Sequence, residues 1–483
     1  MTAKMVMNHS EAYPAQWEWL SASHLPIHYS TAPSKHGLPW MITPALLNAH
    51  THLDYTLCEE ARALAPHAFP HSSDSLLEGQ RFSTTPNMAR WLLWLVTEYL
   101  PAWRASTHSL SEAHLTERTV LGALKALSTY GVGTIADIAR SATVLETLLT
   151  HAPKTLHAWV SFEAIGVGDP SHSLSPLLKG WLHTWEKACH IWEHASATHQ
   201  ASILLGLSPH SAYNVSQATW QWLIEQAKLT LPYRHPPLAL HTHGLESESE
   251  WQLFTHGPDA LEEEPFNLPQ FHRNVLGFPT PNTMWTWGNT ATDPFWERSI
   301  ERCHKRTGVT HSLVAHGVYD THGLLHPSTH TPGRAWVVCP RSNVWLQGKT
   351  LSLRPEWLET SHLPFNFGTD SLLSTPTLDP REEARFLRTW WQEHPSPETQ
   401  GATVSYHALW RALTQATPAL KAILPQTPAP LVAWYWDATV SVQERHQINA
   451  HCLRAFEANN PEVFAMYLLD PRLICTPPRS HTP

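Results

Sequence analysis

Two histidines one residue apart, His50 and His52, follow a short apolar run near the start of the chain. The run, residues 41–47, predicts a β-strand, and residues two apart on a strand point to the same side. Both imidazoles are therefore expected to converge on one point beyond the strand. Two converging neutral imidazoles form half of a site for Zn²⁺ or a similar borderline metal ion.

Residues of the same kind end other apolar runs. With 35 histidines in the chain, about two or three His-x-His pairs are expected by chance at this composition, so spacing alone decides nothing. Position is more informative, because barrel enzymes place their chemistry at the carboxyl ends of their strands. Four predicted strands end in such side chains: His50 and His52, His243 with Glu246, His316, and Asp370.

The motifs that carry these residues resemble those of the amidohydrolase superfamily, in its branch of nucleoside and heterocycle deaminases and chlorohydrolases. The resemblance covers about residues 40–375. The closest groups are the methylthioadenosine/S-adenosylhomocysteine deaminases and the aminofutalosine deaminases. The matching segments are PALLNAHTHLD (44–54), SPHSAYNVS (208–216), HGLESESE (243–250), AHGVY (315–319), CPRSN (339–343) and FGTDS (367–371).

The resemblance implies a role for each of these residues. The implied metal ligands are His50, His52, His243 and Asp370. The implied catalytic residues are Glu246, which would carry protons, His316, which would polarise or orient the water, and Asp370, which would accept the proton of the water. A glutamate at a helix start can also serve as a capping residue.

Three further residues are candidates for substrate binding: His210, Arg341 and Asn343. His210 is expected to bind a ribose hydroxyl or a carboxylate, whereas Arg341 could bind substrate or pair with a neighbouring carboxylate. His241 lies two residues before His243 and is interpreted as a layer residue of the barrel core. The long segments 55–88 and 257–296 are also expected to help select the substrate.

The expected cofactor is one divalent metal ion, with Zn²⁺ favoured and Fe²⁺ as the alternative. Dinuclear members of the superfamily bridge two metals with a carboxylated lysine on strand four, and ILLGLSPH (203–210) contains no lysine. Three imidazoles and one carboxylate leave a net positive site, which lowers the pKa of a bound water towards neutrality.

The order of elements predicts a (β/α)₈ TIM barrel, because eight short apolar strands alternate mostly with helices. A helix over 115–131, with Gly131 as its C-cap, precedes the strand 132–138. We expect three parts: an N-terminal segment at 1–40, the barrel at 41–415, and an atypical C-terminal segment at 416–483. The two terminal parts are expected to form a reduced or atypical small β-rich domain.

Composition narrows the function classes. A net charge of −9 with no cluster of basic residues argues against nucleic acid or an anionic membrane as partner. Six scattered cysteines and no apolar run of membrane-spanning length suggest a soluble cytoplasmic protein. The expected partner is a small-molecule substrate, and a homo-oligomer is left open. The 24 tryptophans predict a Trp-rich core.

The leading hypothesis is a mononuclear deaminase of an adenosine-like nucleoside or another cyclic amidine, acting through metal-activated water. One alternative is hydrolytic removal of a halide or another leaving group from a triazine-like heterocycle. Another is an inactive barrel that acts as a binding protein, although such a barrel would usually have lost one of the six site residues.

Overall fold

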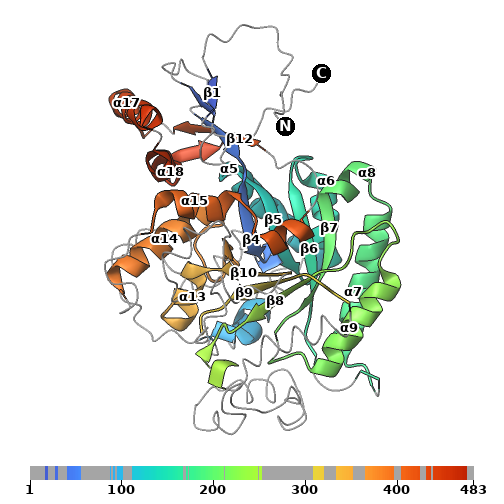
Figure 1. The fold of residues 1–483 in the computed structure, drawn as a ribbon. Coiled ribbons are helices and arrows are strands. Elements are labelled where there is room, and N and C mark those ends of the chain that lie inside the picture. Colours follow the sequence, from blue (N-terminus) through green and yellow to red (C-terminus); the bar gives the residue numbers. More distant parts are fainter. Residues whose placement is uncertain are drawn as a thin grey trace.

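The computed structural model (Figure 1) describes residues 17–19, 28–30, 41–55, 88, 91–92, 95–101, 111–166, 170–171, 173–211, 213–248, 250–252, 308–319, 333–351, 365–395, 404–424, 431–436, 439–458 and 460–475. The segments 56–87 and 253–307 lie outside these residues. Most of the two segments that are expected to help select the substrate, 55–88 and 257–296, lies outside the described residues. Among the described residues, no helix is long and apolar enough to cross a membrane.

Eight strands form a nearly closed barrel in which neighbours in the chain are neighbours in the sheet, and every pairing is parallel. A parallel bridge between Thr51 and Asp370 joins the first strand to the end of the last. The predicted TIM barrel is therefore confirmed. The strands are β4 (Leu46–Thr51), β5 (Val132–Ala139), β6 (His157–Ala164), β7 (Ile203–Pro209), β8 (Leu240–Gly244), β9 (Ser312–His316), β10 (Arg334–Val338) and β11 (Phe365–Phe367).

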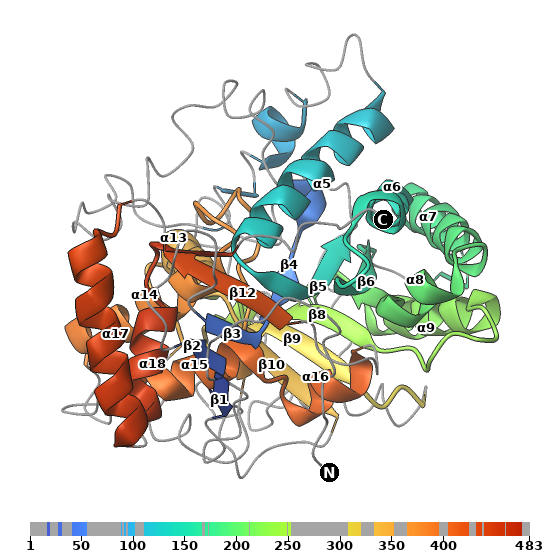
Figure 2. The same ribbon diagram turned by 90° about the horizontal axis from the view of Figure 1, so that it is seen from above.

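Helices surround the strands, as the view from above shows (Figure 2). The helices between the strands follow the predicted alternation. They are α5 (Glu112–Thr129), α6 (Ala142–His151), α7 (Pro176–Glu193), α8 (Ala197–Ser202), α9 (Gln217–Thr230) and α13 (Pro340–Gln347). After the last strand come α14 (Pro380–Glu393), α15 (Tyr406–Thr414), α16 (Pro418–Ile423), α17 (Val442–Glu457) and α18 (Pro461–Leu468). Short helices lie at η1 (Leu53–Tyr55) and η2 (Leu95–Tyr99).

The C-cap of α5 is Tyr130, one residue before the Gly131 that the sequence analysis expects there, and Gly131 follows it in the turn. Its φ of 73° is a left-handed conformation that glycine adopts without strain. A side chain there would also collide with Trp434, because a Cβ atom would lie 2.7 Å from the indole ring. The chain can therefore turn directly from α5 into β5.

The predicted strand over 41–47 is divided in two, which corrects that expectation. Residues Met41–Pro44 form β3 in a separate sheet, and β4 begins at Leu46. β3 ends at Pro44. Because proline has no backbone N–H to donate to a neighbouring strand, it is suited to the end of a strand. His50 and Thr51 still end the barrel strand, and His52 directly follows it.

Both termini contribute to the second sheet, as predicted. It is antiparallel, in the order β1 (Trp17–Trp19), β2 (His28–Ser30), β3, β12 (Leu431–Trp436), β13 (Leu473–Cys475). In Figure 1 it lies above the barrel, beside α17 and α18. The domain boundaries at 40/41 and 415/416 stay a prediction.

Tryptophans fill much of the core, in agreement with their high number. Trp159, Trp185, Trp192, Trp220, Trp410 and Trp434 are among the largest fully buried side chains. Burying such large rings gives the scaffold much of its hydrophobic stabilisation. A packed core of this kind holds the strand ends, and the side chains on them, in fixed positions.

Candidate metal and active site

The strand ends bring all four expected metal ligands together at one end of the barrel. His50 and His52 come from the end of β4, His243 from β8, and Asp370 from just after β11. Each of these residues is at most 6% exposed. One ring nitrogen from each of His50, His52 and His243 lies within 4.8 Å of the others, a group that could hold a metal ion.

Hydrogen bonds fix which ring nitrogens face the centre. Nδ1 of His243 lies 3.1 Å from the carbonyl oxygen of His210, which can only accept, so Nδ1 carries the proton. This leaves Nε2 of His243 as the atom that could bind a metal ion, and it lies 3.2 Å from Nε2 of His52. Two nitrogens bound about 2.0–2.1 Å from a tetrahedral Zn²⁺ lie roughly 3.3 Å apart. The spacing therefore fits a shared metal ion.

Asp370 presents one carboxylate oxygen to the histidines and anchors the other. Oδ1 lies 3.6 Å from Nε2 of His52 and 3.8 Å from Nε2 of His50. Oδ2 accepts hydrogen bonds from the hydroxyls of Ser342, at 2.6 Å, and Ser374, at 2.8 Å. Such outer partners orient a ligand and tune its affinity for metal.

The backbone around these residues is shaped by the close approach of β11 to β4. Asp370 has a φ of 59°, and His316 on β9 has a φ of 79°. Left-handed conformations are uncommon in residues other than glycine and cluster at functional sites. Gly368 is required beside them, because a Cβ atom there would lie 2.5 Å from Cβ of His50.

The protonation of the histidines also suits a metal. Burial lowers the pKa of His50, His52 and His243, with repulsion from the other histidines adding to the effect on His50 and His243. All three imidazoles are therefore neutral near pH 7, the form that binds metal. Nε2 of His50 is buried and has no hydrogen-bond partner in the described part of the chain. A metal ion would satisfy that atom, so the donor set fits the group that the motifs imply.

His241 lies in the barrel core, stacked on Trp159 with ring centres 5.3 Å apart. The structure also gives it a contact that the sequence analysis does not foresee. Its Nε2 lies 2.9 Å from Nδ1 of His50. With Nδ1 of His50 as donor, His241 would hold the His50 ring so that Nε2 faces Asp370. His241 therefore contacts the ring of His50 in addition to its place in the core.

Glu246 and His316 form a pair beside the expected metal ligands. Oε1 of Glu246 lies 3.6 Å from Nε2 of His316, and both side chains are buried. Nδ1 of His316 lies 2.9 Å from Oδ1 of Asn343, so Asn343 can orient this ring. Burial, with a smaller contribution from Asp370, raises the pKa of Glu246 well above its ordinary value of 4.5. A glutamic acid that keeps its proton to a higher pH can act as a proton donor.

Ser247 and Glu250 provide the helix capping that the sequence analysis also considers for Glu246. The backbone N–H of Glu250 donates to Oγ of Ser247 at 3.0 Å, and the N–H of Glu246 donates to Oε2 of Glu250 at 2.9 Å. This reciprocal arrangement is close to a capping box. The Glu246 carboxyl group is thereby left to face His316.

His210 lies at the end of β7 and stacks on His243, with ring centres 4.5 Å apart. Its Nε2 lies 3.9 Å from Oε1 of Glu163, a residue near the end of β6 that the sequence analysis does not select. A signal for Glu163 exists, because it is the one charged residue in the otherwise largely apolar strand HAWVSFEA.

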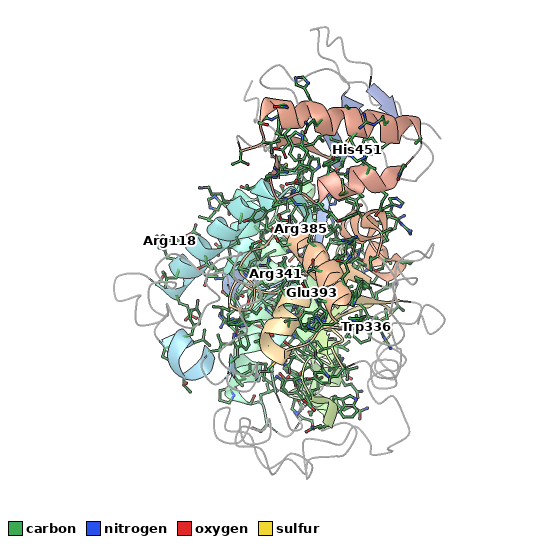
Figure 3. The ribbon with its side chains drawn as sticks, turned by 90° about the vertical axis from the view of Figure 1, so that its left-hand side faces the viewer. Arg118, Trp336, Arg341, Arg385, Glu393 and His451 are labelled. Carbon is green, nitrogen blue, oxygen red and sulfur yellow. The ribbon has the colours of Figure 1, made fainter. Side chains whose placement is uncertain are left out.

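Arg341 is brought to a buried carboxylate rather than left open at the barrel mouth. It is 4% exposed and is labelled in the middle of the molecule in Figure 3. Its backbone N–H donates to Oε2 of Glu383 on α14 at 2.9 Å. Its positive charge also lowers the pKa of Glu383, although burial is the larger effect and raises that pKa to about 8. Nη1 of the Arg341 guanidinium is buried and has no hydrogen-bond partner within the described residues, so the pairing interpretation and the substrate-binding role of Arg341 both stay predictions.

The raised pKa of Glu383 predicts a pH-dependent stability. The folded-state value of about 8 lies above the ordinary value of 4.5. The contribution of this group is therefore fully present below about pH 4.5 and is lost as the pH rises towards 8. Glu383→Gln keeps an oxygen for the Arg341 N–H but cannot ionise. The free energy of unfolding of the variant minus that of the wild type should increase with pH, by up to about 1.4 kcal/mol per pH unit.

Denaturant titrations at pH 5, 6, 7 and 8 measure this difference. Glu225→Gln, on the exposed side of α9, is the matched control and should show no such trend. A difference for Glu383→Gln that stays constant with pH would contradict the prediction.

Comparisons with known proteins give structural likeness only. No protein-family model and no curated protein sequence matches the chain. Helicobacter pylori aminofutalosine deaminase in complex with methylthio-coformycin has a TM-score of 0.53 and 19% identity, covering 85% of this chain and 83% of that one. Guanine deaminase from C. acetobutylicum with bound guanine has a TM-score of 0.55 and 14% identity, covering 90% and 84%.

A third solved structure of similar fold is a chlorohydrolase. Atrazine chlorohydrolase from Arthrobacter aurescens, complexed with zinc, has a TM-score of 0.51 and 15% identity, covering 81% of this chain and 75% of that one. At these identities the likeness concerns the fold. The chain therefore has the barrel fold shared by these deaminases and this chlorohydrolase, as the motifs at its strand ends predict.

Proposed function

We propose that this protein is a mononuclear metal-dependent aminohydrolase of the amidohydrolase superfamily, which deaminates an adenosine-like nucleoside or another cyclic amidine. The observation that carries the proposal is a single constellation at one end of the barrel. There, His50, His52, His243 and Asp370 surround one point, and the Glu246–His316 pair lies beside it. Fold likeness to two deaminases supports the same class of reaction.

The chain's own residues supply the proton transfers that deamination needs. Glu246 would give a proton to the ring nitrogen of the substrate, and its raised pKa suits that role. His316, held by Asn343, would orient the attacking water from the other side of the Glu246 carboxyl group. Asp370 would take up the proton of the attacking water through Oδ1, since Ser342 and Ser374 occupy Oδ2, and would deliver it to the departing amine, which leaves as ammonia. Glu246 would recover its proton from the new hydroxyl group as the carbonyl forms. A divalent metal, when bound, makes hydroxide available near neutral pH.

We expect one metal ion per chain, and zinc as the favoured ion. Three imidazoles and one carboxylate suit zinc and leave room for water. The described strand β7, ILLGLSP, has no lysine to bridge a second ion. Protein expressed with supplemented metal should contain about one divalent ion per chain by elemental analysis. Two tightly bound ions, or none, would count against this site.

The activity is tested by an ammonia-release screen over adenosine derivatives, guanine, pterins and triazines. Removal of metal with a chelator should abolish release, and adding Zn²⁺ or Fe²⁺ back should restore it and identify the effective ion. Release of chloride from a chlorinated triazine without release of ammonia would favour the second candidate, hydrolytic removal of a halide. The fold that this chain shares with atrazine chlorohydrolase is the reason to include chlorinated triazines in the screen, and it does not favour halide removal over deamination.

A barrel that only binds its ligand is the third candidate. It would hold small molecules without converting any of them, with or without metal. The presence of all six site residues in one constellation disfavours it. A cytoplasmic location and a homo-oligomeric state stay predictions.

A further inference from the structure

We propose that Asp137, near the end of β5, is a positioning residue for the expected metal ligand His52, which it holds by binding the residues on either side of it in the chain. The inference rests on the metal site of the proposed function. It goes beyond that function because it assigns a role to a strand end from which no site residue is expected.

His52 lies just past the last residue of its strand. The register between β4 and β5 shifts between Asn48 and Thr51, and pairing resumes with Thr51 opposite Asp137. β4 then ends at Thr51. An irregularity of this kind disrupts the ladder of backbone hydrogen bonds, and such irregularities are common next to active sites. Contacts other than the regular ladder must therefore fix the chain at His52.

Asp137 supplies such contacts through one carboxyl oxygen. Its Oδ1 accepts hydrogen bonds from the hydroxyl of Thr51, at 2.8 Å, and from the backbone N–H of Leu53, at 2.9 Å. Thr51 precedes His52, and the N–H of Leu53 belongs to the peptide group that follows it. Thr51, Leu53 and Asp137 are all fully buried, so these hydrogen bonds form in a low dielectric. Asp137 therefore fixes the backbone of His52 from both sides.

Asp54 and Arg140 join the same two strand ends a second time. Asp54 follows β4, and its Oδ2 accepts the backbone N–H of Arg140, the residue after β5, at 2.9 Å. Cζ of Arg140 lies 3.8 Å from the centre of the Tyr55 ring. That ring makes an edge contact with the ring of His52, with centres 5.6 Å apart. These contacts support the side chain of His52, whereas Asp137 holds its backbone.

The other three expected ligands each have a hydrogen-bonding partner at their own side chain. Asp137 does the corresponding work for His52 through the chain. Loss of an outer partner of a ligand typically lowers metal affinity about 10–100-fold. If the backbone of His52 is released, its ring no longer stays in the orientation that the ion requires. Both the affinity for metal and the geometry of the bound ion should then change.

Asp137 acts as a hydrogen-bond acceptor and not as a charge. Burial raises the pKa of Asp137 to about 8, and the charge of Asp54 adds to this effect. The carboxyl group therefore carries a proton at neutral pH. Oδ2 has no hydrogen-bond partner among the described residues and is the oxygen available for that proton. Asparagine has the shape of the protonated acid and keeps the accepting oxygen, so Asp137→Asn is the conservative replacement.

The test measures metal binding and metal geometry without any substrate. In competition with a chelator of known affinity, Asp137→Ala should bind Zn²⁺ about tenfold or more weakly than the wild type. The visible absorption of its Co²⁺-loaded form, which depends on ligand geometry, should also differ from that of the wild type. Asp137→Asn should restore the affinity to within about threefold of the wild type, in line with its retained acceptor, and should restore the spectrum.

A second variant tests the same contact if Asp137→Ala does not fold. Thr51→Val keeps the shape of the side chain but removes one of the two hydrogen bonds to Oδ1 of Asp137. Its affinity for Zn²⁺ should lie between those of the wild type and Asp137→Ala, and its Co²⁺ spectrum should be shifted as well.

Glu462→Ala is the matched control. It removes another carboxyl group that accepts two backbone N–H groups, those of Tyr406 and His407, at 2.6 and 2.8 Å. Glu462 lies on α18 and caps α15, so its loss should lower the unfolding temperature. The affinity for Zn²⁺ and the Co²⁺ spectrum should stay as in the wild type.

Wild-type affinity and spectrum in every folded variant, with only a lower unfolding temperature, would overturn the inference. The same holds if Asp137→Asn binds Zn²⁺ as weakly as Asp137→Ala, because the accepting oxygen would then not be what matters. If metal binding changes as expected but no compound is deaminated, the inference stands and the proposed function fails. Deamination by the wild type, together with unchanged metal binding in Asp137→Ala, would have the opposite meaning.

Discussion

Glu246→Gln should lower the turnover number by about 100-fold or more while leaving one metal ion bound. Glutamine keeps the size and hydrogen-bonding capacity of the side chain but cannot carry a proton. In the folded protein this carboxyl group lies 3.6 Å from His316 and outside the three-histidine group. Ammonia release measures turnover, elemental analysis measures the bound metal, and thermal unfolding measures stability. All three are measured on the same preparation.

A matched control lies two residues away. Glu248 is exposed on the first turn after the strand and is expected to take no part in the reaction. Glu248→Gln makes the same chemical change and should keep turnover within about twofold, in line with the small effects of surface replacements. If Glu246→Gln retained full turnover and instead unfolded at a lower temperature, Glu246 would be a structural residue and the proton-transfer role would be wrong.

The barrel could be predicted from the sequence because its strands are short apolar runs with polar ends. The predicted strand 132–138 matches β5 (Val132–Ala139) to within one residue. A buried parallel strand has apolar side chains on both faces, so it appears as a continuous apolar run. The abrupt change to His or Asp then marks the carboxyl end, and this placed His50, His316 and Asp370 at one end of the barrel.

Residues that act through another residue could not be predicted in this way. His241 contacts His50 across 191 positions of the chain, and Ser342 contacts Asp370 across 28. Such contacts depend on the pleat and stagger of the closed barrel, which no local pattern encodes. Glu163 was missed for another reason. Its strand, HAWVSFEA, is not one of the segments whose sequence resembles the amidohydrolase superfamily. The division of 41–47 between two sheets likewise depends on the pairing of β3 with the distant β12.

Asp370→Asn should remove most of the metal and with it the activity. The replacement keeps the size of the side chain and tolerates the left-handed φ of 59°, so it should fold. It removes the negative charge that faces His50 and His52 at 3.8 and 3.6 Å. Loss of an outer-sphere partner already costs about 10–100-fold in metal affinity, so loss of the ligand charge should cost about 100-fold or more.

Ser374→Ala makes this a graded test. It removes one of the two hydroxyls that hold Oδ2 of Asp370 and leaves the other, from Ser342, in place. Its metal affinity, measured by competition with a chelator of known affinity, should lie between the wild type and Asp370→Asn. If Asp370→Asn bound metal as tightly as the wild type, the three histidines would suffice and Asp370 would act only on protons. If Ser374→Ala lost more metal than Asp370→Asn, the hydroxyl itself would be the more important contact, and the assignment of Oδ1 as the metal-facing atom would be wrong.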